Sequence, residues 1–367
     1  MVALTDIAIQ VIGRDDPGYD DARAVFNAMI DRRPLAIIRC RDAIDVAAGI
    51  RYARDHDLVL SVRGGGLGWL NARYGLACDN LIGAEVVTAD GEILQVGPDE
   101  HPDLLWGLRG GGGNLAVVTS FTYRLHPVSS VLAGALTHAW AAARDVLRHH
   151  HAFMASAPDE LTSVVSLGLD PAGTPAVTIL VCWSGDPAEG ERILRPLRSF
   201  GPPLDDSIGV LPYPDWQRAP DPGYPRGRLH YWKSGYLRHL TDAALDALLA
   251  IPPTTPTPAT GIGLQGLRGA AARVPVDATA FPHRAEQYDL LILAQWSEPA
   301  RTDEHVGWTR AAFDALRPHL EDAVYVNNLG TEGPERIRSA YGPNHARLAA
   351  LKRTYDPANV FLSLIHI

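Results

Sequence analysis

The sequence predicts an α+β protein with two domains. The chain has 367 residues, and single hydrophobic cores stop growing at about 250–300 residues, so we expect two domains rather than one. Hydrophobic residues make up 46% of the chain and charged residues 20%, a balance that excludes wholesale disorder. After Pro127 the predicted strands come in consecutive pairs with helices between them, which favours a mixed or antiparallel sheet.

The N-terminal part of the chain alternates predicted helices and strands. Apolar residues at helical spacing indicate the helices, and short apolar or β-branched runs indicate the strands. Asp42 is expected to cap the second helix. Asp90-Gly91 predicts a hairpin, because this pair favours the tight turn between antiparallel strands. We expect helices over 19–31 and 43–56 and strands over 35–39, 58–62, 85–88, 93–96 and 117–125.

The same patterns continue beyond Pro127. They predict strands over 161–169, 176–183 and 288–296, and helices over 140–154 and 302–320 and up to Phe200. The proline-rich stretches 201–228 and 252–258 are expected connections, and 325–361 should hold a short strand and two helices. The run His149-His150-His151 should form a solvated helix face rather than a metal site, because adjacent helical residues point in different directions.

Charge and composition exclude several functions. The net charge of −9 argues against nucleic-acid and membrane partners, which call for a basic patch. No apolar run approaches the roughly 20 residues that span a bilayer. The N-terminus lacks a basic leader followed by an apolar stretch, so we expect a cytoplasmic protein. The three cysteines are far apart and predict neither a disulfide framework nor a metal site.

Two glycine clusters stand out, one at 64–68 and one at 110–113. Glycine lets the backbone approach a ligand closely, so successive N–H groups can converge on a phosphate. Tight turns explain such clusters equally well, and both interpretations stay open for either cluster alone. The stretch 111–116 matches the dinucleotide pattern G-x-G-x-x-A. That motif needs a strand before it and a helix after it, and here the expected order is reversed, which disfavours a Rossmann site.

Tyr325-Val-Asn327 predicts a pair of functional side chains. In a strand, residues two apart face the same side, so a phenol and an amide would project together. A tyrosine with a lowered pKa can act as a general base, and an asparagine can both donate to and accept from the edge of a heterocycle. The alternative is a core tyrosine whose hydroxyl is satisfied by the protein.

Several motifs in this order resemble one family. They are Arg63-Gly-Gly-Gly66, Arg73-Tyr-Gly-Leu-Ala-Cys-Asp-Asn80, Val86-Val-Thr-Ala-Asp-Gly91, Pro102-Asp-Leu-Leu-Trp-Gly-Leu-Arg-Gly-Gly-Gly-Gly-Asn114, Tyr231-Trp-Lys-Ser234, Thr279-Ala-Phe-Pro-His-Arg284, Tyr325-Val-Asn327 and Tyr355-Asp-Pro357. The chain resembles the FAD-linked oxidases of the vanillyl-alcohol oxidase and p-cresol methylhydroxylase family, in its bacterial berberine-bridge-enzyme-like branch.

The resemblance implies a two-part fold. A PCMH-type FAD-binding domain would be formed by residues 1–128 together with 325–367. A substrate-binding domain, with a large antiparallel sheet backed by helices, would be formed by 129–324.

The resemblance also implies a site. FAD would be the cofactor, and Tyr325 would be the catalytic base. A small-molecule alcohol, sugar or secondary metabolite would pass a hydride to the flavin, and molecular oxygen would reoxidise it. The cofactor-binding residues carried over from the family are Arg63, Gly64, Gly65, Gly66, Gly68, Asp79, Gly112, Gly113, Val117, Val118 and Asn327.

The chain departs from the family pattern at three places: the first glycine loop with its junction, Ala116, where the family usually has glycine, and the C-terminal tail. Leu67 stands where many members have a histidine bonded to the flavin, so we expect non-covalent FAD. The sequence passes from Gly66 directly into a later family motif, so a segment after Gly66 is expected to be missing from the FAD domain. The tail Leu362-Ser-Leu-Ile-His-Ile367 differs from the usual family ending, and we expect that it is not native sequence.

These departures keep a second function open. The chain is either an FAD-dependent oxidase or a non-catalytic remnant of one, with a defective FAD site, that at most binds a small molecule. A nicotinamide dehydrogenase is disfavoured by the strand expected after Gly113.

Overall fold

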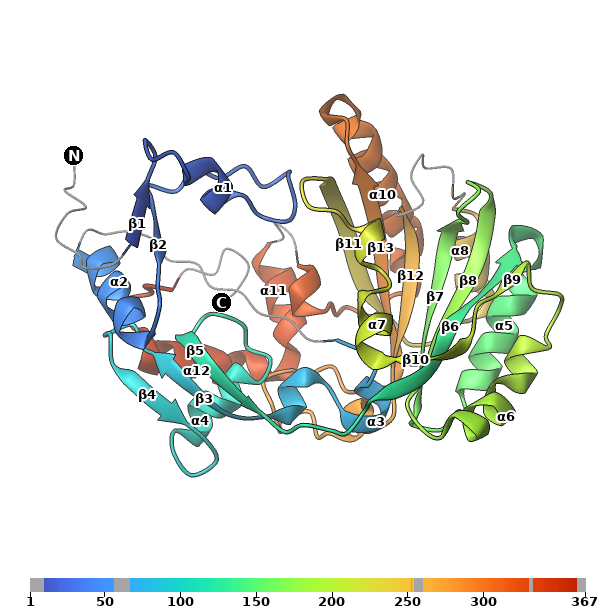
Figure 1. Ribbon diagram of the computed structural model, residues 1–367, viewed down its shortest axis with the longest axis horizontal. Helices are drawn as coiled ribbons and strands as arrows, with labels where there is room; N and C mark the ends of the chain where they lie inside the picture. Colours follow the sequence, from blue (N-terminus) through green and yellow to red (C-terminus); the bar gives the residue numbers. More distant parts are fainter. Residues whose placement is uncertain (1–9, 56–66, 252, 254–259, 330–332, 362–367) are drawn as a thin grey trace.

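The computed structural model describes residues 10–55, 67–251, 253, 260–329 and 333–361. The strand predicted over 58–62 and the loop 63–66 lie outside these residues. The described chain forms two lobes that lie side by side (Figure 1). One lobe carries the N-terminal and C-terminal parts of the chain, and the other carries a large sheet.

The N-terminal lobe contains two small antiparallel sheets. Strand β1 (Gln10–Gly13) pairs with β2 (Ala36–Arg39), and β3 (Leu81–Val87) lies between β4 (Ile93–Val96) and β5 (Val117–Tyr123). The predicted hairpin is confirmed: Val87 pairs with Ile93, and Gly91 adopts φ +79°, which glycine takes without a Cβ penalty. The predicted cap of α2 (Ala43–Asp55) is also confirmed, because Asp42 Oδ1 accepts from the Asp45 N–H at 2.9 Å.

The prediction of a helix over 19–31 is correct for its first five residues and wrong for the rest. Helix α1 covers only Tyr19–Arg23. The next residues reach across to the other lobe, where the Ala28 N–H donates to the Arg228 carbonyl at 2.9 Å and Asn27 Nδ2 donates to the His230 carbonyl at 2.9 Å. Contacts with the other lobe therefore replace the hydrogen bonds of a continued helix.

The second lobe is built on an eight-stranded sheet with the order β10-β6-β8-β7-β12-β13-β11, in which β9 pairs with β6. All the pairings are antiparallel, which the resemblance implied and which is one of the two arrangements, mixed or antiparallel, that the paired strands favoured. The strands are β6 (Ser130–Ala139), β7 (Leu161–Leu169), β8 (Pro175–Trp183), β9 (Asp205–Asp206), β10 (Gly209–Pro212), β11 (Leu229–Leu237), β12 (Gly261–Leu267) and β13 (Gln287–Trp296).

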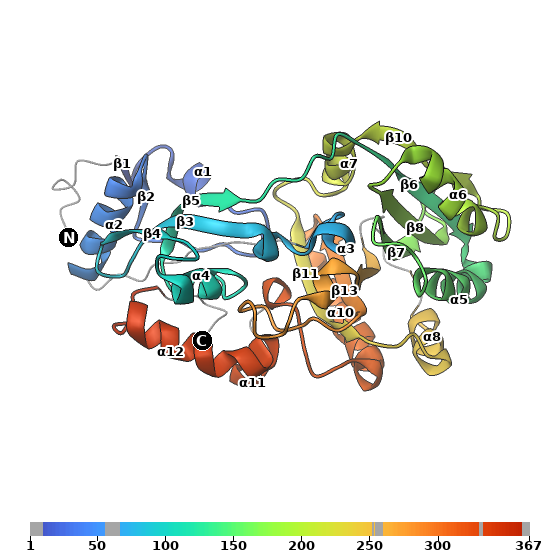
Figure 2. The same cartoon turned by 90° about the horizontal axis from the view of Figure 1, so that it is seen from below.

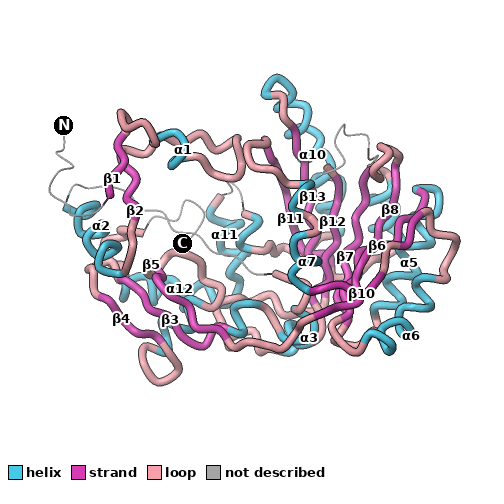
Figure 3. Tube along the Cα trace, viewed as in Figure 1, coloured by secondary structure: helices cyan, strands magenta, loops and turns pink. Residues whose placement is uncertain are grey.

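Helices cover one face of this sheet and form the main core with it (Figure 3). These are α5 (Ala143–Met154), α6 (Pro187–Arg198), α8 (Asp242–Leu249) and α10 (Thr302–Leu316). Side chains alternate along each strand, so Val165 and Ile292 are buried against the helices while their neighbours Val164 and Leu291 face the opposite side and line a cavity there.

The histidine run on α5 is packed, which corrects the expectation of a solvated face. His150 is buried and bonds Ser163 Oγ at 2.9 Å, and burial lowers its pKa to about 3. His149 stacks on Phe200, and His151 bonds the Tyr288 hydroxyl. The three rings point to different partners, as helical geometry requires.

The C-terminal segment returns to the N-terminal lobe. Val324, Tyr341 and Leu348 share a core with Leu104 and Leu115. Figure 2 shows α11 (Pro334–Tyr341) and α12 (His345–Tyr355) lying along the same lobe as α4 (Pro102–Leu108). The division into 1–128 with 325–367 and 129–324 stays a prediction, and these contacts agree with it.

Candidate active site

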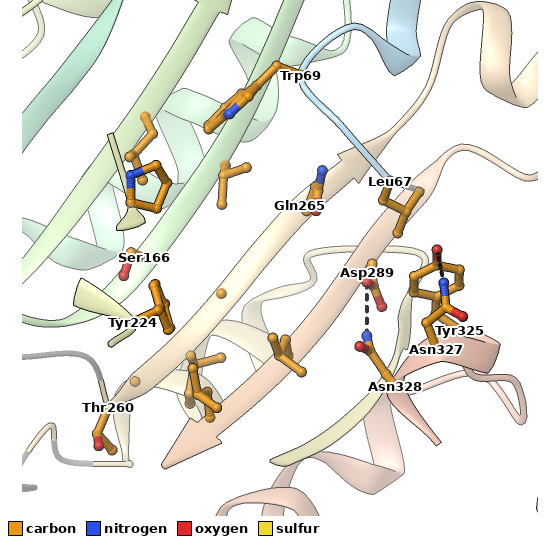
Figure 4. Close-up of a pocket in the computed structure, with 18 residues that line it drawn as sticks. Leu67, Trp69, Ser166, Tyr224, Thr260, Gln265, Asp289, Tyr325, Asn327 and Asn328 are labelled. Carbon is orange, nitrogen blue, oxygen red and sulfur yellow. Dashed lines mark hydrogen bonds between the residues drawn. The ribbon is translucent and has the colours of Figure 1, made fainter. Parts of the chain in front are cut away.

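A cavity of about 540 Å³ opens on the face of the large sheet that the helices leave free (Figure 4). This volume falls in the range of small-molecule sites, about 300–1,000 Å³. The cavity is lined by Leu67, Trp69, Val164, Ser166, Leu180, Pro220, Tyr224, Thr260, Gly261, Ile262, Gly263, Gln265, Asp289, Leu291, Leu293, Tyr325, Asn327 and Asn328.

Tyr325 reaches this cavity because of the residues on either side of it. Val324 and Val326 are buried in the core of the N-terminal lobe, so the extended chain between them turns the Tyr325 side chain to the opposite side. The ring packs edge-to-face on Phe281, with centroids 6.0 Å apart. Tyr325 therefore lines the cavity, and its role as a catalytic base stays a prediction.

The strand predicted at 325–327 is wrong, although its two side chains do meet. Residues Val326–Asn328 form a single 3₁₀ turn, closed by the Asn328 N–H donating to the Tyr325 carbonyl at 2.9 Å. Trp232 Nε1 ties this turn to β11 by donating to the Asn328 carbonyl. Asn327 Nδ2 donates to the Tyr325 hydroxyl at 2.5 Å, so the turn brings together the pair that a strand would have aligned.

Asp289 adds a buried carboxyl to the same end of the cavity. It is 6% exposed, and Asn328 Nδ2 donates to its Oδ2 at 3.3 Å. Its Oδ1 is buried without a hydrogen-bond partner. Burial raises the pKa of this carboxyl to about 7, and the Asn328 hydrogen bond opposes the shift. An unsatisfied buried acceptor on a cavity wall is a group that a ligand hydroxyl can satisfy.

Sequence reasoning missed Asp289, although a signal was present. An aspartate stands inside the apolar run of β13, where each second residue faces the core. A charged residue is seldom fully buried without a partner, so this position marked the free face of the sheet. Trp69 and Tyr224, which also line the cavity, carried no such signal.

Asp79 was predicted to bind the cofactor, and the described structure places it in an ion pair. Arg284 donates to both carboxylate oxygens of Asp79, at 2.8 and 2.7 Å, and the side chains are 3% and 10% exposed. The Leu76 N–H donates to Oδ2 as well. Two of the motifs that carry the family resemblance therefore bind each other across 205 residues of sequence.

The second glycine cluster joins α4 to β5. A helix precedes it and a strand follows it, which confirms that it lacks the Rossmann order. Gly112 adopts φ +74°, and Gly112, Gly113, Val117 and Val118 are all half-buried. A Cβ at Gly110 would lie 2.7 Å from the Phe281 backbone, so that glycine is required by packing. The cofactor contacts predicted for Gly112, Gly113, Val117 and Val118 stay predictions.

The first predicted loop is only partly described. Arg63, Gly64, Gly65 and Gly66 lie outside the described residues. Gly68 is half-buried with open space where a Cβ would stand. The Leu67 side chain lines the cavity, and Figure 4 shows it near Tyr325.

The described residues contain no group of three or more His, Cys, Asp or Glu side chains that could hold a metal ion. Among the same residues, no helix is long and apolar enough to cross a membrane.

Comparisons with known proteins agree with this geometry. Residues 324–363 match the family model described as berberine and berberine like. An FAD-linked oxidoreductase of Dictyostelium discoideum is 30% identical over 303 residues, which cover 81% of this chain and 65% of that protein. The (R)-6-hydroxynicotine oxidase of Paenarthrobacter nicotinovorans is 27% identical over 455 residues, covering 97% of this chain and 96% of that protein.

A solved structure shares the fold. The crystal structure of 6-hydroxy-D-nicotine oxidase from Arthrobacter nicotinovorans superimposes with a TM-score of 0.86 at 24% identity, covering 98% of each chain. The chain thus shares the PCMH-type fold of that structure. The chain is similar to these proteins, and its residues 324–363 are similar to the berberine-like family.

The chain is shorter than its relatives. It spans 65% of the Dictyostelium protein. The alignment with the hydroxynicotine oxidase runs over 455 residues, although this chain has 367. Many positions of that oxidase therefore have no counterpart here. The prediction that they fall after Gly66 stays a prediction.

Proposed function

We propose that this protein is an FAD-dependent oxidase of a small hydroxylated molecule. The observation that carries this proposal is the polar end of the cavity, where Tyr325, Asn327 and Asp289 lie together on the free face of the large sheet. The names of the relatives, which are FAD-linked oxidoreductases and oxidases, support it.

FAD would lie between the lobes. Gly112, Gly113, Val117 and Val118 would offer backbone amides to it, together with Gly68 and the loop 63–66. Asn327 would face its ring. Because Leu67 stands at the position of the anchoring histidine, the cofactor would be held without a covalent bond. When bound, FAD would supply the redox chemistry, accepting a hydride from the substrate carbon and passing the electrons to oxygen.

Residues of this chain would accept and hold the proton that the substrate hydroxyl loses. Tyr325 would accept the proton of the substrate hydroxyl as the C–H bond breaks, and a base positioned in this way contributes about 10²–10⁴-fold to the rate. Asn327 Nδ2 donates to the Tyr325 hydroxyl, which stabilises the phenolate form of that side chain. The unpaired Oδ1 of Asp289 would accept a hydrogen bond from the substrate or from a bound water.

The test replaces Tyr325 with Phe. The ring and its packing on Phe281 are kept, and only the hydroxyl is lost. We expect unchanged flavin content, measured by visible absorption, and flavin reduction slowed by about 10²–10⁴-fold in anaerobic single turnover. Hydroxylated ring compounds are screened first, and the fastest reductant of the wild type is used.

Tyr224→Phe is the matched control, because Tyr224 lines the same cavity at its other end (Figure 4). It should leave the reduction rate within a few-fold of the wild type. Equal rates in wild type and Tyr325→Phe at equal flavin loading would remove Tyr325 from the reaction.

A second candidate function is a binding protein without redox turnover. The observation that favours it is the alignment of 455 residues against a chain of 367, because lost positions could include part of the FAD cradle. Purified protein without flavin absorption, and without uptake of added FAD, would select this candidate.

A further inference from the structure

The cavity has a polar end and an apolar end. Tyr325, Asn327, Asn328 and Asp289 gather at one end, as Figure 4 shows. Away from them the lining is mostly aliphatic and aromatic, with Trp69, Val164, Leu180, Leu291 and Leu293. Among the described lining residues, Asp289 is the one charged side chain, and no cation accompanies it.

The sheet register shows how this lining is laid out. Leu180, Val164, Gln265 and Asp289 form one row across four neighbouring strands. In the next row along the strands, Gly263 lies between Ser166 on β7 and Leu291 on β13. A position without a side chain therefore stands one row away from the buried carboxyl, on the floor of the cavity.

Gly263 is not required by the backbone. A Cβ built there would meet only the Leu291 carbonyl oxygen, at 3.9 Å, which is ordinary contact. Gly261, on the same face of β12, differs, because its Cβ would lie 2.5 Å from the Leu167 carbonyl oxygen. Packing thus explains Gly261, whereas Gly263 leaves room that the fold itself does not need.

The apolar end carries four polar side chains, Ser166, Tyr224, Thr260 and Gln265, and Thr260 already bonds the backbone. Thr260 Oγ1 donates to the Gln295 carbonyl and accepts from the Gln295 N–H. A sugar needs hydrogen bonds around most of its perimeter, because buried hydroxyls without partners cost free energy. A fused ring system with one hydroxyl needs them only at one end, and its apolar body gains from burial.

We propose that this cavity takes an uncharged, multi-ring apolar molecule with a single reacting hydroxyl, and that Gly263 sets the room for its ring system. The hydroxyl lies at Tyr325 and Asp289, and the rings lie over Gly263 between Ser166 and Leu291. The inference rests on the proposed function only in treating this cavity as the substrate site.

The test measures binding and not turnover, so it is independent of flavin reduction. The full chain is titrated calorimetrically with 17β-estradiol, with 2-naphthol and with cellobiose, each at several temperatures. We expect the two ring compounds to bind with a negative heat-capacity change, the marker of apolar burial, and cellobiose to give no binding.

Substitutions at Gly263 make the test specific. Gly263→Ala and Gly263→Val should weaken estradiol binding in a graded way, by about tenfold or more for valine, while 2-naphthol is affected less because it is smaller. Gly266→Ala is the matched control, because Gly266 lies on the same strand outside the lining and a Cβ there would meet only the Ser163 carbonyl at 3.8 Å. Thermal unfolding checks that all three variants are folded.

Two kinds of result would overturn the proposal. One is that cellobiose binds as tightly as the ring compounds, or that neither ring compound binds. The other is that Gly263→Val binds estradiol with the wild-type affinity. Flavin content is measured on the same samples, so a chain that binds rings but lacks FAD would contradict the oxidase and leave this inference standing.

Discussion

Replacing Asp289 with Asn should stabilise the protein at alkaline pH and have little effect in acid. Burial raises the pKa of this carboxyl from 3.8 to about 7. Each pKa unit is worth about 1.4 kcal/mol, so the ionised group costs the folded state about 4 kcal/mol. The asparagine keeps the shape, and its carbonyl oxygen can accept from Asn328 Nδ2, but it carries no charge.

The pH dependence has a definite sign. Between about pH 4 and pH 7 the folded protein keeps the Asp289 proton while the unfolded chain has lost it, so stability falls as the pH rises through this window. The free energy of unfolding is measured in urea at several pH values across it. The variant should gain on the wild type with rising pH, by up to about 4 kcal/mol near pH 8, and match it near pH 4.

Asp314→Asn on the exposed surface of α10 is the control for removing one negative charge. It should shift stability little and without this pH profile. Parallel stability curves for the wild type and Asp289→Asn between about pH 4 and pH 8 would refute the argument that Asp289 is buried at a cost.

Two further predictions concern the cofactor and the buried ion pair between Arg284 and Asp79. Acid denaturation should release all bound FAD into the supernatant, because Leu67 cannot bond to the flavin; a yellow pellet would contradict this. Arg284→Met should lower the free energy of unfolding by about 3–5 kcal/mol, because it leaves Asp79 buried without its partner. Arg273→Met, which breaks the exposed ion pair with Asp159, should lower the free energy of unfolding much less. Equal urea midpoints for the two variants would contradict the expectation that the buried Asp79 pair matters more for stability than the exposed one.

Local patterns predicted the regular elements of this fold well. Strand β7 matches the expected 161–169, and β8 and β13 each begin one residue before their predicted starts, because their β-branched and apolar runs are long and uninterrupted. Strands β1, β6, β9, β10, β11 and β12 were not predicted, and β9 and β10 lie in the stretch 201–228 that was expected to be a connection. Glycines interrupt β12, and β11 mixes polar with aromatic residues, so neither shows a clear alternation. Strand β12 forms because β7 and β13 pair with it on either side, and β11 forms because it pairs with β13 at the edge of the sheet.

The candidate site was predicted from one motif and completed by the fold. Tyr325 and Asn327 were expected together, and they meet through a turn rather than a strand. Asp289 joins them from a strand 36 residues earlier in the chain, and Trp69 lines the same cavity from the N-terminal part. Such long-range proximity depends on sheet order, which no local pattern encodes. Asp79 shows the converse, since a motif residue is bound to a distant arginine.

The buried Lys352 has a chemical consequence. Its ammonium donates to the carbonyls of Asn114 and Phe361 and to the carboxylate of Asp356, which uses all three of its N–H donors. The chain has only one other lysine, Lys233. An amine-directed reagent therefore reaches Lys352 only when α12 separates from the second glycine cluster. The rate at which Lys352 is acylated therefore reports how often the C-terminal segment opens. This one amino group measures the local opening of the contact between α12 and the residues around Asn114.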